Sequence, residues 1–285
     1  LILMTRTSVI LYQLAKKFIS PVLAVFAVIL FNITPGGTIV GILMMHDSFM
    51  IFFWCLTTYF LYKAIFENKS KFWYFAGISG GLGLWSKDIM VLGFVATFLF
   101  LIFSKEYRFW LTKKEPYLAF LISILVFSPI IYWNATNDWV TYRHIFALGT
   151  RPMGMDRLKR MGDFLGSQLG LVSPFIFIGI FVSWINIFIK WLKHKDAKKL
   201  FLLMFSSFVF VFFFLLSAKS KVEGNWAGFG YILGIICYFY VLEEIWRNSA
   251  NAKLKYLKYT IFSGIFSLML IVIMLNPIIL YKIVY

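Results

Sequence analysis

The sequence predicts an all-α protein, a single domain over residues 1–285 in which about ten transmembrane helices form one bundle. Of its 285 residues, 61% are hydrophobic and only 14% are charged, whereas soluble domains are about 45–50% apolar and about 25% charged. The apolar residues form runs that approach the roughly 20 residues a helix needs to cross the hydrocarbon. These runs do not alternate with period two, so they predict helices and not the strands of a barrel.

Ten apolar runs give the expected helices. They lie at about 1–15, 18–34, 49–66, 72–86, 89–104, 117–133, 164–189, 200–217, 227–246 and 259–281. The first run is too short to span and carries Arg6, as an interrupted helix would. Because the chain also starts inside this run, at Leu1, we expect an N-terminal part of the natural protein to precede it.

The gaps between runs divide into two sets that predict the topology. One set is rich in lysine, and Lys and Arg near the ends of spans favour the cytoplasmic side. This set comprises Lys16-Lys17 and residues 67–71, 104–116, 190–199 and 246–258. The other set, which we place outside, comprises residues 33–48, 86–88, 134–168 and 217–226. This arrangement accounts for the net charge of +16 without a nucleic-acid partner, and it puts every segment of unusual composition on one face.

The longest outer segment, residues 134–168, is predicted to contain an amphipathic helix at 153–168. Its apolar residues recur at helical spacing, with basic residues on the other faces. The apolar residues are Met155, Leu158, Met161, Phe164 and Leu165. Two interpretations stay open: a helix lying on the outer membrane surface, or a short helix that only links two spans.

Two further features have structural interpretations. Gly77 and Gly81 make a GxxxG pair inside an apolar run, which predicts close helix packing. Cys55 and Cys237 both lie in apolar runs and have neither a disulfide pattern nor a metal-ligand spacing.

The ionisable residues that could carry chemistry surround the outer mouth of the bundle. They are Asp47, Lys87, Asp88, Asp138, Arg143, Lys219, Lys221 and Glu223. No span has a charge at its middle, which argues against an ion-coupled carrier. A site at the lipid–water boundary suits a substrate with a lipid tail and a polar head. Basic groups there would stabilise charge on a leaving phosphate, and a carboxylate would take the proton of an attacking hydroxyl.

Several of these residues have alternatives that the sequence leaves open. Asp47 precedes an apolar run, so it serves chemistry, caps its helix, or does both. Lys87 could extend to the headgroups, pair with Asp88 on the surface or bind phosphate, and its tight outer turn favours phosphate. His46 and His144 are too far apart in sequence to argue for a metal site.

Five outer segments resemble the GT-C membrane glycosyltransferases, the group that includes protein O-mannosyltransferases and lipid A aminoarabinose transferases. They occur in the order of that family and cover roughly residues 1–240. The segments are MHDSFMIFFWCL, GISGGLGLWSKDIMVL, SPIIYWNATNDWVTYRH, FLGSQLGLVSPF and SKVEGNWAGFGY. The last segment, similar to a "K-V-x-x-N-W" pattern, is the most telling.

The resemblance implies sugar transfer from a polyprenyl-phosphate donor on the outer face, with inversion at the sugar carbon and no covalent enzyme intermediate. It also implies that the best-known catalytic carboxylates lie in a first outer loop that would precede this chain, so the fragment is expected to lack its principal base. Asp47 matches the second acidic motif of the family. His46 and Ser48 stand beside it, where Pro and small residues are common.

The predicted site therefore has one catalytic carboxylate, Asp47, and a set of phosphate- and substrate-binding residues: Lys87, Arg151, Lys219, Lys221 and Asn225. No metal ligands are predicted, and a divalent-metal requirement stays open. The expected partners are a polyprenyl-phosphate sugar, membrane lipids and a lipid, glycan or protein acceptor. The expected location is the plasma membrane, with the active face periplasmic or extracellular. The alternative is a carrier or flippase for a lipid-linked or amphiphilic substrate.

Overall fold

The computed structural model describes residues 2–43, 45–150, 156–248 and 250–276, and these contain helices but no strand. The first half of the chain contains α1 (Ile2–Ala15), α2 (Pro21–Asn32), α3 (Pro35–Ile42), α4 (His46–Ile65), α5 (Lys71–Ser86), η1 (Asp88–Met90), α6 (Val91–Phe103), η2 (Arg108–Thr112) and α7 (Glu115–Thr136). The second half contains α8 (Val140–Thr150), α9 (Arg157–Val172), α10 (Pro174–His194), α11 (Ala197–Met204), α12 (Ser207–Ser217), η3 (Gly224–Ala227), α13 (Gly230–Asn248) and α14 (Ala250–Leu275). The predicted all-α class is confirmed.

Five helical stretches among the described residues are long and apolar enough to cross a membrane, and a bent pair makes a sixth if it counts as one span. The five are His46–Ile65, Glu115–Thr136, Pro174–His194, Ala197–Ser217 and Lys253–Leu275. Together these apolar stretches indicate a multi-pass membrane protein.

The predicted number of about ten spans is not confirmed, because the other predicted spans form short or partly charged helices. α1, α5 and α6 have only 14, 16 and 13 residues. α13 is apolar only up to Leu242, since Glu243, Glu244 and Arg247 occupy its last turns.

The bent pair corrects the prediction for residues 18–34 and for the loop expected after them. α2 ends at Asn32, and the chain turns by 72° into α3. Thr34 accepts a hydrogen bond from the backbone N–H of Gly37, and Pro35 occupies the first turn of the helix, where its missing N–H costs nothing. The predicted outer loop therefore begins with a helix.

The bounds of the predicted span at 164–189 are wrong: the span covers Pro174–His194, because the helix breaks at Ser173. This residue has a φ of 78°, a left-handed conformation that interrupts the helical hydrogen bonds. α9 begins at Arg157, where Asp156 caps it, so an amphipathic helix exists over Arg157–Val172. The first predicted residues of this helix, 153–155, lie outside the described residues. Phe164 on α9 is buried, whereas Leu158 is 74% exposed. Its predicted place on the membrane surface stays a prediction.

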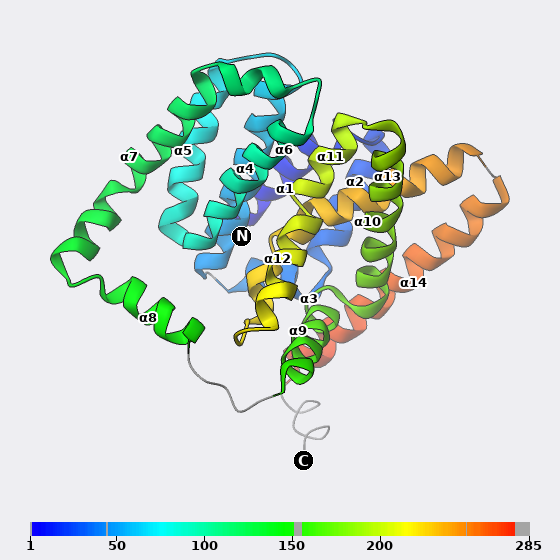
Figure 1. Cartoon of the computed structure of the whole chain (residues 1–285). Coiled ribbons are helices and arrows are strands. Elements are labelled where there is room, and N and C mark those ends of the chain that lie inside the picture. Colours follow the sequence, from blue (N-terminus) through cyan, green and yellow to red (C-terminus); the bar gives the residue numbers. More distant parts are fainter. Residues whose placement is uncertain (1, 44, 151–155, 249, 277–285) are drawn as a thin grey trace.

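The helices pack as two neighbouring groups (Figure 1). In the first, α5 lies between α4 and α7. A Cβ atom at Gly77 would lie 2.5 Å from the carbonyl oxygen of Ala119, and one at Gly81 would lie 2.8 Å from that of Ser123. The predicted close packing at this glycine pair is therefore confirmed, with α7 as the partner.

In the second group α13 is the central helix, contacting α2, α10, α11, α12 and α14. Every residue of α13 from Gly230 to Phe239 is buried, as expected for a helix that is apolar on all sides. The turn η3 leads into the start of α13, and the start of α4 lies beside it in the candidate site described next.

Candidate functional site

The first turn of α4 presents the central residue of the site, Asp47, which is 7% exposed. The next residue holds this turn in place: Ser48 Oγ donates to the backbone carbonyl of Val40 at the end of α3. An acidic residue suits the positive end of a helix. Among the hydrogen bonds of the described residues, however, the Asp47 carboxylate caps no backbone N–H and instead receives side-chain donors.

The first donor is Lys87, which follows the end of α5 in an extended conformation. Its Nζ lies 2.5 Å from Oδ1 of Asp47, and the two side chains are only 15% and 11% exposed. Lys87 thus turns inward. Among the three alternatives for Lys87, the one with a surface pair to Asp88 is not observed, since Lys87 pairs with Asp47 instead.

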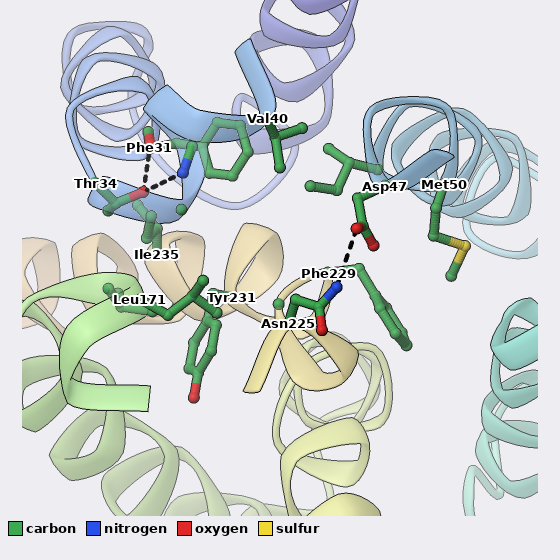
Figure 2. A pocket seen from close by; sticks show the side chains of 15 residues that line it. Phe31, Thr34, Val40, Asp47, Met50, Leu171, Asn225, Phe229, Tyr231 and Ile235 are labelled. Atoms are coloured by element: carbon green, nitrogen blue, oxygen red, sulfur yellow. Dashed lines mark hydrogen bonds between the residues drawn. The ribbon is translucent and has the colours of Figure 1, made fainter. Parts of the chain in front are cut away.

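The second donor is Asn225 in η3, whose Nδ2 donates to Oδ2 of Asp47 at 3.0 Å. Figure 2 shows this contact at the edge of the pocket. His46 Nε2 lies 3.7 Å from the same oxygen. Three of the predicted site residues, Asp47, Lys87 and Asn225, are therefore together although they come from segments 40 and 178 residues apart.

The arrangement leaves hydrogen-bonding capacity unused. A carboxylate has about four acceptor positions, and an ammonium group has three donors. Within the described part of the chain, Asp47 accepts one hydrogen bond on each oxygen, and Lys87 uses one donor on Asp47. A ligand at this point could therefore bring both a hydroxyl for the carboxylate and an anion for the ammonium group.

A small pocket with a cavity volume of about 40 Å³, partly open to solvent, lies beside Asp47 and Asn225. Its other walls come from α2, α3, α4, α9 and α13 and are mostly apolar (Figure 2). Phe31, Phe229 and Tyr231 supply aromatic rings to these walls. A polar edge on an apolar pocket fits a ligand that has both kinds of surface.

Asp88 is a second carboxylate near this point. Burial raises its pKa above the ordinary value, and its carboxylate has no hydrogen bond to the described residues. The pKa of Tyr142 on α8 is also raised, first by burial and then by the charge of Asp88.

Asp47 and Asn225 line this pocket, whereas Lys87 reaches it only through its pair with Asp47, and the other predicted residues do not line it. Lys219 and Lys221 are exposed on the link between α12 and η3. Lys221 pairs with Glu223 at 3.2 Å, with both side chains more than half exposed. Arg151 lies outside the described residues. Phosphate binding by these three residues stays a prediction.

Sequence reasoning missed two residues that support the pocket, Gln168 and Tyr231. Both stand in segments that carried the family resemblance, but neither received a role. Their signal was a polar group within an otherwise apolar run. The apolar pocket residues carried no such signal, because apolar residues are common in every helix of this chain.

Within the described residues, no group of three His, Cys, Asp or Glu side chains could hold a metal ion. Whether the protein requires a divalent metal therefore stays as open as the sequence left it.

Comparisons with known proteins bear on the class of protein. Residues 1–133 match the sequence profile described as dolichyl-phosphate-mannose-protein mannosyltransferase. The chain is 21% identical over 248 residues to a lipid A galacturonosyltransferase of Rhizobium johnstonii, covering 87% of this chain and 51% of that protein. This chain thus spans about half the length of that relative, and no solved structure matches it. The resemblance to the GT-C membrane glycosyltransferases, predicted from the outer segments, is confirmed.

Proposed function

We propose that this chain forms part of a membrane glycosyltransferase that moves a sugar from a polyprenyl-phosphate donor to an acceptor hydroxyl. The observation that carries the proposal is the Asp47 carboxylate, shared by Lys87 and Asn225 at the edge of an apolar pocket. The family resemblance supports the reaction class. The name of the curated relative, a lipid A galacturonosyltransferase, favours a glycolipid among the lipid, glycan and protein acceptors.

In the proposed reaction the acceptor oxygen attacks the anomeric carbon of the donor and forms the new glycosidic bond. The bond between that carbon and the phosphate oxygen breaks, and its electron pair leaves with the polyprenyl phosphate. Attack from the face opposite the leaving group inverts the sugar carbon. The hydroxyl proton passes to a carboxylate, a role that general-base catalysis assigns to a group within hydrogen-bond reach.

Asp47 is the carboxylate of this chain that we place in contact with the acceptor hydroxyl. Asn225 fixes one of its oxygens, so the other hydrogen-bonding positions keep a defined direction. Lys87 uses its remaining donors on the departing phosphate, where charge develops as the bond breaks. We place this reaction at the outer face of the plasma membrane, because the outer segments of the predicted topology supply all three residues.

A transfer assay on the full-length protein tests the proposal. The wild-type protein, Asp47→Asn and the control Asp138→Asn are reconstituted in vesicles with a labelled polyprenyl-phosphate sugar and a glycolipid acceptor. Asp138 is an exposed carboxylate in the turn after α7, so the control makes the same chemical change outside the pocket. Loss of a catalytic carboxylate predicts a rate at least about 100-fold lower for Asp47→Asn, with Asp138→Asn unchanged.

Two results would contradict the proposal. Equal rates for Asp47→Asn and the wild-type protein would remove Asp47 from the site. A labelled donor that crosses the bilayer but is never consumed would instead support the carrier or flippase alternative.

A further inference from the structure

We infer that Gln168 and Tyr231 are positioning residues that hold Asn225 against Asp47. Neither contacts Asp47 directly. They form a buried hydrogen-bonded connection behind the pocket, between α9, η3 and α13. Its consequence for sugar transfer rests on the proposed function, whereas its consequence for the η3 turn does not.

The side chain of Gln168 is the centre of this connection and is completely buried. Its Nε2 donates to the carbonyl oxygen of Gly224 at 3.0 Å and also lies 3.0 Å from Ser167 Oγ. Its Oε1 accepts a hydrogen bond from the hydroxyl of Tyr231 at 2.8 Å. The carbonyl needs a donor, so the amide has one orientation that satisfies both neighbours.

The hydrogen bond from Gln168 to Gly224 affects the site because the residue after Gly224 is Asn225. η3 lies directly on α9 here: a Cβ atom added to Gly224 would lie 2.6 Å from Ser167 Oγ. The turn is short, and the N–H of Gly228 donates back to the carbonyl of Asn225 at 3.0 Å. Fixing the Gly224 carbonyl therefore also fixes where the Asn225 side chain starts.

Tyr231 holds the other side of the same turn. Its N–H donates to the carbonyl of Gly228, and its ring lines the pocket. The ring stacks on Trp184 of α10, with an interplanar angle of 15°. The hydroxyl is thus aimed at Gln168 by packing, and the η3 turn is held both before and after Asn225.

Because these groups are buried, removing one of them leaves its partner unsatisfied. The local consequence is a looser η3 turn. The consequence for the reaction is a less well placed Asn225, and small displacements of positioning groups lower the rate of chemistry more than they weaken binding.

The experiment compares Tyr231→Phe with Tyr238→Phe in the full-length protein. Both substitutions remove a buried hydroxyl from α13, but Tyr238 bonds Thr260 on α14 instead of Gln168. Gln168→Met and Asn225→Ala, alone and combined, complete the set. The readouts are hydrogen exchange of residues 219–229, kcat and KM with the labelled donor, and thermal unfolding of each variant.

We expect faster hydrogen exchange at 219–229 in Tyr231→Phe and Gln168→Met, and no change there in Tyr238→Phe. We expect kcat to fall about tenfold in Tyr231→Phe and Gln168→Met, with KM within about twofold. In the Asn225→Ala background, Gln168→Met should lower kcat little further, since residues that act through one another are not additive.

Two results would overturn the inference: unchanged hydrogen exchange at 219–229 in Tyr231→Phe, or an equal loss of kcat on Gln168→Met with and without Asn225. If Gln168→Met does not fold, the comparison of Tyr231→Phe with Tyr238→Phe still tests the inference. If the wild-type protein transfers no sugar, the proposed function fails, and the exchange comparison tests the positioning role by itself.

Discussion

The two ends of α4 use the same ion-pair chemistry in different surroundings. At its start, Asp47 is enclosed between Lys87 and Asn225 at a pocket. Just past its end, Glu67 pairs with Lys17 at 2.6 Å and with Lys69 at 2.7 Å, with the lysine side chains 32% and 53% exposed. The Asp47 side chain is 11% exposed and the Glu67 side chain 21%, so the difference lies mainly in the lysine partners, which are more exposed at Glu67.

This difference indicates which ion pairs of the chain are candidates for a functional role and which are not. Exposed pairs contribute little to stability because water and salt screen them. A largely buried pair loses hydration and depends on its partners. The carboxylate of the pair at Asp47 also lines the pocket, so a change there should affect both folding and chemistry. The pair at Glu67 should affect neither by much.

The largest effect on stability should follow from Lys87→Met, which leaves the buried Asp47 carboxylate without its cation. Breaking one partner of a buried pair costs about 3–5 kcal/mol. Because this pair keeps some contact with solvent, we expect about 3 kcal/mol, measured by denaturant unfolding in detergent. Adding Asp47→Asn should restore much of the stability but none of the transfer. If Lys87→Met is as stable as the wild-type protein, the pair is not buried as described.

A smaller effect is expected from Asn225→Ala. It removes one hydrogen bond from the Asp47 carboxylate, and a hydrogen bond to a charged group is worth about 1.5–3 kcal/mol. Asn225 is itself exposed, so we expect a loss of stability near the low end of this range. We expect the transfer rate to be about tenfold lower. Asn137→Ala, at the exposed turn after α7, is the control. An unchanged rate would separate Asn225 from the site.

At the other end of α4, Glu67→Gln should lower stability by less than about 1 kcal/mol. Hydrogen bonds from Lys17 and then from Lys69 lower the pKa of Glu67 below its ordinary value of 4.5. A lowered pKa contributes stability above the ordinary value and loses it as the pH falls through the lowered value. The difference between the variant and wild type should therefore be present at pH 7 and shrink below pH 4.5. A difference that grows with acid would contradict this.

The smallest effect on stability should come from Lys221→Ala, because the pair with Glu223 is exposed and contributes close to nothing. The same substitution also tests the prediction that Lys221 binds phosphate. If that prediction holds, binding of polyprenyl phosphate weakens several-fold, and the loss diminishes at high salt as charges are screened. Unchanged binding would exclude Lys221 from the donor site.

Much of this architecture could be predicted from the sequence. Composition predicted the helical class, and the outer segments predicted that Asp47, Lys87 and Asn225 belong to one site. These three could be found because charged or amide side chains beside apolar runs cost free energy, so they are typical of functional sites. Their mutual contacts could not be predicted, since they depend on how α4, α5 and η3 pack.

The errors have equally specific causes. Apolar run length cannot show the break at Ser173 or the 72° bend before α3, because both depend on local backbone geometry. The predicted span at 227–246 is not confirmed, because α13 carries Glu243, Glu244 and Arg247 in its last turns and packs among other helices of the protein. In such a chain lipid and protein interior favour the same residues, so composition alone does not separate a span from a buried core helix.

We propose above all that the lipid-linked substrate enters the pocket lined by Asp47 and Asn225, with Lys87 paired to Asp47 beside it. A structure of the full-length protein determined with bound polyprenyl phosphate tests it most directly. We expect a phosphate oxygen at hydrogen-bond distance, about 3 Å, from Lys87 Nζ, with Asp47 and Asn225 beside it. A phosphate bound elsewhere, with this pocket empty and the three side chains unchanged, would contradict the claim.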